Sequence, residues 1–296
     1  MPYISRKPWL IALAALAMLI SAKSGAQTKY PEPENATVRD GVFRDAYFGL
    51  TYPLPAGWVE DIKGPEPSAS GFYSLAALKP RDDFSATIQI AAQDNFFAEP
   101  PFNGAADFLA AMKRGLDASL AASDVSAAEF AGLHFARLDY SGAGLIHAVF
   151  AAEIRCHTVL FTITAGSQER IAELAGSLQK ITYTEHAWQA SWESGQAGAW
   201  PVCVPEAGYR DHIVHTVDPV MTGPRYASVP VRLVIGADGK LEHIHAIAGD
   251  PEQIRSLKDA LQKWEFKPYL VQSQPAEVET GILFQFPRPP QPRTSR

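Results

Sequence analysis

The C-terminal fold is decided by the sequence VPVRLVIGADGKLEHIHAIAGDPEQIRSLKDALQKWEFKPY at residues 229–269, followed by PAEVETGILFQF at residues 275–286. Residues 229–235 alternate and are rich in β-branched side chains, which favours a strand. The turn that follows contains Gly239, which tolerates the positive φ of a tight turn. The returning strand, residues 241–247, does not alternate strictly, so the pattern predicts a hairpin with a β-bulge.

A helix should follow the hairpin. Asp250 is a favoured N-cap residue, and Pro251 suits the first helical position. Apolar side chains then recur at helical spacing, at Ile254, Leu257, Leu261 and Trp264. Pro268 prevents the helix from continuing. A last strand is predicted over residues 278–286, which gives the order hairpin, helix, strand.

This order, with the run WEFKPY at residues 264–269 after the helix, resembles the C-terminal domain of TonB-family energy transducers. The matching positions are Asp238, Gly239, Trp264, Phe266, Pro268 and Phe286. The resemblance implies recognition through an exposed strand edge that pairs with an extended peptide from a partner. That family carries a membrane anchor and a long Pro-rich stretch before this domain, whereas this chain has a predicted folded block there.

The last strand is the candidate edge. Its predicted partner-binding side chains are Thr280, Ile282, Phe284 and Phe286. The alternative is that the Pro-rich tail, residues 287–296, covers this edge. The tail has the composition of a disordered segment.

The preceding block, residues 42–183, predicts strands, a helix, more strands and a closing helix. Residues 105–121 have helical apolar spacing, residues 145–152 and 155–164 form an apolar hairpin, and Ser167 can cap the last helix. This order is typical of an α+β fold in which helices pack on an antiparallel sheet. The predicted chain therefore has two α+β domains, the second over residues 203–286, joined by a linker over residues 184–202.

Two stretches of the first block resemble the PsbP-like fold. One is GLTYPLPAGW at residues 49–58, and the other runs from FTIT at residues 161–164 to SLQKI at residues 177–181. The resemblance implies a binding or accessory domain without catalytic residues.

Residues 1–26 have the pattern of an export signal. Arg6 and Lys7 precede the apolar stretch 9–20, and small residues lead to a predicted cleavage after Ala26. The apolar stretch is shorter than the about 20 residues that span a bilayer, although an uncleaved anchor is the alternative. Cleavage would make the protein periplasmic or secreted and leave residues 27–41 as a polar, Pro-containing flexible arm.

Charge excludes one class of partner. Removing Arg6, Lys7 and Lys23 with the signal takes the formal net charge from −6 to −9. Binding to nucleic-acid phosphates requires clustered Lys and Arg. An acidic chain therefore predicts no nucleic-acid partner.

The two cysteines, Cys156 and Cys203, leave two readings open. An exported chain with an even number of cysteines permits a disulfide. Two unpaired, partly buried thiols are the other reading, because the spacing matches no zinc or redox motif.

Catalytic motifs are absent from the sequence, and no catalytic, cofactor-binding or metal-binding residue is predicted. His243 and His245 would share one face of a strand and could reach one ion, while His212 and His215 fall in a loop. The predicted function is a non-enzymatic envelope protein that binds a partner peptide or protein, such as an outer-membrane receptor, or a second copy of itself. The alternatives are a membrane-anchored TonB-type energy transducer for outer-membrane transport, and a metal-binding or hydrolytic enzyme that uses the late histidines.

Overall fold

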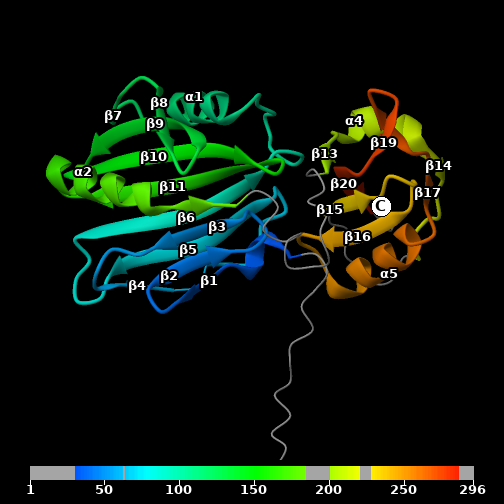
Figure 1. Cartoon of the computed structure of the whole chain (residues 1–296), viewed down its shortest axis with the longest axis horizontal. Helices are drawn as coiled ribbons and strands as arrows, with labels where there is room; N and C mark the ends of the chain where they lie inside the picture. The colour runs from blue at the N-terminus through cyan, green and yellow to red at the C-terminus, as the bar shows by residue number, and fades with distance from the viewer. Residues whose placement is uncertain (1–30, 63, 185–200, 221–227, 287–296) are drawn as a thin grey trace, which may run out of the picture.

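The computed structural model describes residues 31–62, 64–184, 201–220 and 228–286. The protein is a mixed α+β structure with mostly antiparallel strands and few helices (Figure 1), which confirms the expected fold class. The predicted signal, most of the predicted linker and the Pro-rich tail lie outside the described residues. Within the described ranges, no helix is long and apolar enough to cross a membrane.

The largest sheet has eight strands and is antiparallel throughout. Its order is β4-β5-β6-β11-β10-β9-β7, and β8 also pairs with β9. The strands are β4 (Trp58–Glu60), β5 (Phe72–Pro80), β6 (Ala86–Asp94), β7 (Ala121–Ala122), β8 (Ser126–Phe130), β9 (Leu133–Gly142), β10 (Leu145–Ile154) and β11 (His157–Ala165). The predicted apolar hairpin is confirmed as β10 and β11, which pair from Ile146↔Ala165 to Ile154↔His157.

A second, four-stranded sheet packs on the first. Its order is β1-β2-β3-β12, with β1 (Thr37–Arg39), β2 (Val42–Asp45), β3 (Leu50–Pro53) and β12 (Thr182–Tyr183). Phe43 and Tyr52 from this sheet share one buried core with Ile88 and Phe161 from the larger sheet. We call residues 31–184 the N-terminal sandwich.

The prediction of a flexible arm over residues 27–41 is wrong where the structure describes it. Residues Pro33–Asn35 form the 3-10 helix η1, and β1 pairs with β2 from Thr37↔Arg44. Pro33 is buried, so this segment belongs to the folded sandwich although its composition is that of a loop.

Two helices cover the sandwich. Helix α1 (Ala105–Gly115) places Leu109 against Leu138 and Val149 of the large sheet. It ends earlier than the predicted residue 121, because residues 121–122 pair as strand β7 with β9. Helix α2 (Gln168–Ser177) is followed by η2 (Leu178–Lys180), and its N-cap Ser167 accepts a hydrogen bond from the Arg170 amide, as predicted.

The C-terminal part forms a separate four-stranded sheet. Its order is β13-β20-β15-β16, with β13 (Val202–Cys203), β15 (Ser228–Ile235), β16 (Leu241–Ala246) and β20 (Val278–Gln285). The strands pair antiparallel except β13, which runs parallel to β20. The predicted bulge is present, because the β15–β16 register shifts between Val234 and Ile235. Residues 201–286 are called the C-terminal unit.

Helix α5 (Pro251–Leu261) packs on one face of this sheet. Asp250 caps it through the amides of Glu252 and Gln253, as predicted. Leu257 and Leu261 are buried in a core that includes Val231 and Leu233. The smaller elements are α4 (Glu206–Tyr209), η3 (Arg210–His212), β14 (Ile213–His215), β17 (Glu265–Phe266), β18 (Tyr269–Val271) and β19 (Gln274–Ala276).

The other face of the C-terminal sheet meets the N-terminal sandwich (Figure 1). Residues 232, 279 and 283 point to this side, because Arg232 pairs with Asp94, Glu279 pairs with Arg155, and Leu283 packs on the sandwich core. We call the contact between this face and the sandwich the junction. Both faces of the C-terminal sheet are therefore covered.

Candidate functional site

Strand β20 is the strand predicted to form an exposed sheet edge, and in the structure only part of its outer side lacks a described partner strand. It pairs with β15 along its whole length, from Val278↔Ile235 to Gln285↔Ser228. On its other side it pairs with β13 at Val278 and Glu279 only. No strand among the described residues pairs with this outer side from Gly281 to Gln285.

The four predicted partner-binding side chains do not line an exposed surface. Phe286 is buried in the core of the C-terminal unit, Ile282 and Phe284 are partly buried and pack against that core, and Thr280 is fully buried. The reason is the twofold alternation of a strand, which places these even-numbered residues on the side of the unit's own core. The expectation of an exposed face is therefore wrong for Thr280 and Phe286, and partner binding through these side chains stays a prediction. No described strand pairs with the outer side of this stretch.

The unpaired groups of β20 are on its backbone. The Val202 amide donates to the Glu277 carbonyl at 2.8 Å, and the Val204 amide donates to the Glu279 carbonyl at 3.0 Å. Backbone polar groups of alternate residues point to the same side of a strand. The N–H and C=O groups of Gly281, Leu283 and Gln285 therefore point outward, beyond the end of β13.

A cavity of about 870 Å³ lies beside this stretch, between the sandwich and the C-terminal sheet. Its lining is mainly apolar and includes Phe96, Phe102, Phe108, Met112, Ser228 and Leu283. Gly281 is a sequence signal for this close approach, because a Cβ atom there would lie 2.6 Å from Cβ of Phe96.

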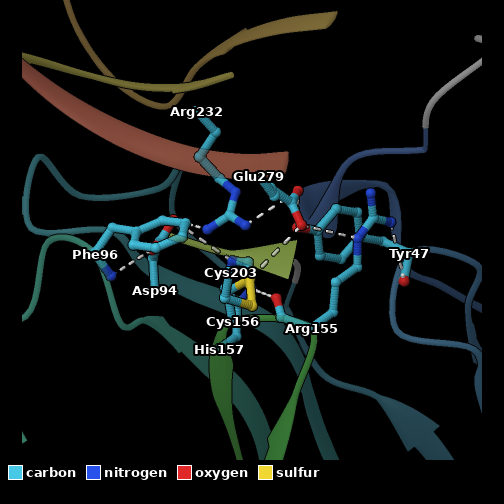
Figure 2. The surroundings of a disulfide bond; sticks show 9 residues. All are labelled: Tyr47, Asp94, Phe96, Arg155, Cys156, His157, Cys203, Arg232 and Glu279. Atoms are coloured by element: carbon cyan, nitrogen blue, oxygen red, sulfur yellow. Dashed lines mark hydrogen bonds and ion pairs between the residues drawn. A yellow bond between two sulfur atoms is a disulfide. The ribbon is translucent and has the colours of Figure 1, made fainter. Parts of the chain in front are cut away.

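Deeper in the junction lies a cluster of buried charges, which sequence reasoning missed. Nη1 of Arg232 donates to Oδ2 of Asp94 at 2.6 Å, and Nη2 lies 3.0 Å from Oε1 of Glu279. Nε of Arg155 lies 3.3 Å from Oε2 of Glu279, and the Tyr47 hydroxyl donates to Oε1 at 3.0 Å (Figure 2). We call Asp94, Arg155, Arg232 and Glu279 the charge cluster.

The pKa shifts show how this cluster is balanced. Burial raises the pKa of Asp94 above its ordinary value, against the opposing effect of Arg232. Burial also acts to raise the pKa of Glu279, but Arg155 and Arg232 together hold it below its ordinary value. Burial lowers the pKa of His157 well below its ordinary value, and Arg232 adds to this effect. His157 is therefore neutral, and the positive charges of the cluster are those of its two arginines.

The cysteines form a disulfide between Cys156 and Cys203, with a Cα–Cα distance of 5.7 Å (Figure 2). Of the two readings open from the sequence, the structure has the disulfide. The bond joins the turn between β10 and β11 of the sandwich to strand β13. It therefore fixes β13 at the position where it pairs with β20.

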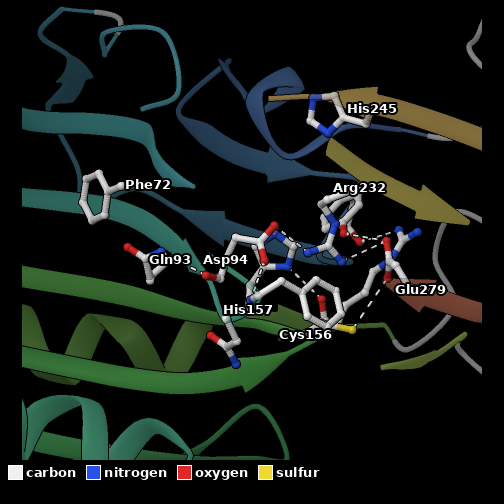
Figure 3. Close-up of polar contacts among 12 residues, drawn as sticks. Phe72, Gln93, Asp94, Cys156, His157, Arg232, His245 and Glu279 are labelled. Atoms are coloured by element: carbon white, nitrogen blue, oxygen red, sulfur yellow. Dashed lines mark hydrogen bonds and ion pairs between the residues drawn. The ribbon is translucent and has the colours of Figure 1, made fainter. Parts of the chain in front are cut away.

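The late histidines divide into two groups. His245 projects from β16 toward the junction (Figure 3), where its Nε2 lies 2.8 Å from Oε1 of Glu34, and Nε2 of His243 lies 3.5 Å from Oε1 of Glu32. His212 instead stacks on Tyr209, with ring centroids 5.3 Å apart. The structure thus brings the strand histidines to glutamates that precede β1, and it leaves His212 outside this group.

Comparison with known proteins identifies no family. No family model matches the chain, and no curated protein matches it. Among solved structures, the cyanobacterial PsbP protein CyanoP from Synechocystis sp. PCC 6803 aligns with 56% of this chain and 99% of its own. The sequence identity is 11% and the TM-score is 0.36.

Proposed function

We propose that this protein is a non-enzymatic interaction protein of the bacterial envelope. Its C-terminal unit is a TonB-C-terminal-like module that binds an extended partner peptide by strand pairing. The observation that carries the proposal is that none of the described strands pairs with the outer side of β20 from Gly281 to Gln285. An exposed strand edge offers a row of backbone donors and acceptors that a peptide strand can satisfy.

The neighbouring cavity supports a preference for apolar peptides. Side chains of an added strand alternate between the two faces of the sheet. Those on the face of Leu283 would enter the cavity lined by Phe96, Phe102 and Phe108. The backbone of β20 would supply affinity, and the cavity would select peptides with apolar or aromatic side chains at alternate positions.

An oxidising compartment is part of the proposal. Disulfides persist in the periplasm and outside the cell and are rare in the cytosol. The Cys156–Cys203 bond therefore supports export, as does the signal-like pattern of residues 1–26. Cleavage near Ala26 would release the protein into the periplasm or the medium.

The experiment uses the chain from residue 27 to residue 296 and two variants of one exposed residue. Gln285→Pro removes the outward N–H of Gln285, whereas Gln285→Ala removes the same side chain and keeps that N–H. Proteins captured from envelope extracts by the parent chain are identified by mass spectrometry, and peptides derived from them are tested for binding. Thermal melting of both variants checks that the fold is retained.

We expect a bound peptide to slow amide exchange at Gly281, Leu283 and Gln285 in the parent chain. Gln285→Ala should bind as the parent does, and Gln285→Pro should lose at least tenfold in affinity. Equal binding by both variants, or protection of another strand, would contradict strand pairing at β20. Capture of the chain itself through β20 would identify a homodimer as the partner.

A further inference from the structure

A second cluster of ligand-type side chains lies at the junction, separate from the edge of β20. It consists of Glu32 and Glu34, which precede β1, and of His243 and His245 on β16. Nε2 of His245 lies 2.8 Å from Oε1 of Glu34 and 3.9 Å from Oε2 of Glu32. Nε2 of His243 lies 3.5 Å from Oε1 of Glu32. We call these four residues the His-Glu cluster.

The fold brings these residues together from distant parts of the sequence. His243 and His245 are two apart on β16 and therefore share the face that meets the sandwich. Pro33 is buried and holds η1 against the sandwich, which places the carboxylates on either side of it at this junction. From the sequence, His243 and His245 could reach one ion, but the two glutamates are not candidate ligands, because both fall in the segment whose composition indicates a flexible arm.

Three of the distances between these side chains are close to those between ligand atoms of a four-coordinate metal site. In a tetrahedral zinc site with bonds of about 2.0–2.2 Å, neighbouring ligand atoms lie about 3.3–3.6 Å apart. The observed separations of 2.8, 3.5 and 3.9 Å bracket this range. One ligand atom from each of Glu32, Glu34 and His245 lies within 4.8 Å of the others. His243 is outside this group of three but lies beside Glu32, so its side chain would have to move toward Glu34 and His245 to become the fourth ligand.

Charge also favours a cation. Arg155 and Arg232 line the same small cavity of about 10 Å³, but both are paired with the carboxylates of the charge cluster. The positive charge of Lys258 on helix α5 helps to lower the pKa of Glu32. The two glutamates bring two negative charges, and Oε2 of Glu34 is buried without a hydrogen-bond partner among the described residues. A divalent ion would balance these charges and use that oxygen.

We propose that Glu32, Glu34, His243 and His245 bind one divalent transition-metal ion, of which Zn²⁺ fits best. Imidazole and carboxylate together suit zinc among the common divalent metals. Four protein ligands leave no open coordination position, which is the arrangement of structural sites. The ion would join the segment before β1 to the edge strand β16, and it would tie the C-terminal unit to the sandwich at a second place besides the disulfide.

The test uses the untagged chain from residue 27 onward after treatment with a chelator. Zn²⁺ is titrated calorimetrically, and Co²⁺ is used as a spectroscopic probe of coordination geometry. The ligand variants are His243→Ala/His245→Ala and Glu34→Gln, which preserves the shape of the side chain. The matched control is His134→Ala/His215→Ala, because both of these histidines are exposed. Thermal melting without metal checks that each variant folds.

We expect the parent and the control to bind one equivalent of Zn²⁺ with a submicromolar Kd and to give tetrahedral Co²⁺ absorption. The double histidine variant should bind at least 100-fold more weakly, and Glu34→Gln at least 10-fold more weakly. The melting temperature of the parent should rise with Zn²⁺, and that of the double variant should not. No binding below 10 µM by the parent, or equal affinity in the Glu34→Gln variant, would overturn the site.

Discussion

Replacement of Arg232 by Met tests whether the junction depends on the balance of the charge cluster. Arg232 is only 2% exposed and contacts Asp94 at 2.6 Å and Glu279 at 3.0 Å. Methionine approximates the length of the arginine stem but supplies neither the charge nor the hydrogen bonds. After the substitution, Arg155 remains as the single cation beside two buried carboxylates.

The expected loss follows from this imbalance. Removing one partner of a buried ion pair leaves an uncompensated charge, which destabilises a protein by about 3–5 kcal/mol. Asp94 is fully buried and loses its arginine partner. We therefore expect Arg232→Met to lower the free energy of unfolding by about 3–5 kcal/mol at pH 7, which is a large share of the total for a typical domain.

The matched control is Arg170→Met, which makes the same substitution at an exposed pair. Nη1 of Arg170 lies 2.6 Å from Oε2 of Glu173 on the surface of α2. Exposed pairs contribute about 0–1 kcal/mol, so this variant should lose less than about 1 kcal/mol. Chemical denaturation followed by circular dichroism gives both values, and calorimetry shows whether the sandwich and the C-terminal unit unfold together.

The stability lost in the Arg232→Met variant should depend on pH in a definite direction. Burial already raises the pKa of Asp94, and removing Arg232 raises it further. In the variant, the native state then takes up a proton at a higher pH than the unfolded state does. The stability of the variant should therefore rise as pH falls toward that raised pKa, and its difference from the parent should narrow. The reasoning would be refuted if Arg232→Met and Arg170→Met lost the same unfolding free energy at pH 7. It would also be refuted if the stability difference between Arg232→Met and the parent widened at lower pH.

Two further predictions concern the same junction. The double substitution Cys156→Ser/Cys203→Ser removes a crosslink between residues that are 47 apart in sequence. Loop-closure entropy predicts that the free energy of unfolding, measured without reductant, falls by about 4 kcal/mol. A decrease below about 1 kcal/mol would contradict this prediction. Burial raises the pKa of Asp45 to about 7 from an ordinary value of 3.8, so the parent should lose up to roughly 4 kcal/mol of stability as pH rises from 4 to 8. Melting curves at pH 5 and pH 8 should show a smaller decline for Asp45→Asn, and equal declines would rule out this origin.

Local signals in the sequence predicted the elements of the C-terminal unit well. Asp250 and Pro251 mark the start of α5, and the irregular alternation of residues 241–247 marks the bulge, because caps and bulges depend on nearby residues. The pairing of Val202 and Cys203 with β20 could not be predicted in the same way. Two residues carry no periodicity, and the disulfide partner Cys156 lies in the other part of the chain.

The side chains of the candidate edge were misassigned for a related reason. Alternation along β20 identifies two faces but does not say which face is solvent-exposed. In this protein helix α5 covers one face and the sandwich covers the other, so both sets of side chains are partly or fully buried. The buried charges were equally invisible, because Asp94, Arg232 and Glu279 are far apart in sequence and each is an ordinary surface residue by type.

The position of the stretch of β20 whose outer side pairs with no described strand gives the proposed function its physical basis. The disulfide holds β13 on the first two residues of β20, and Arg232 and Glu279 tie β15 and β20 to the sandwich. Gly281 then lets β20 approach Phe96 closely, beside the cavity. A partner peptide would therefore meet a strand edge and a cavity that are already held in place. Because little of this protein needs to be ordered on binding, the entropic cost falls mainly on the peptide. The disulfide and the charge cluster, which hold this edge in place, should therefore influence affinity as well as stability.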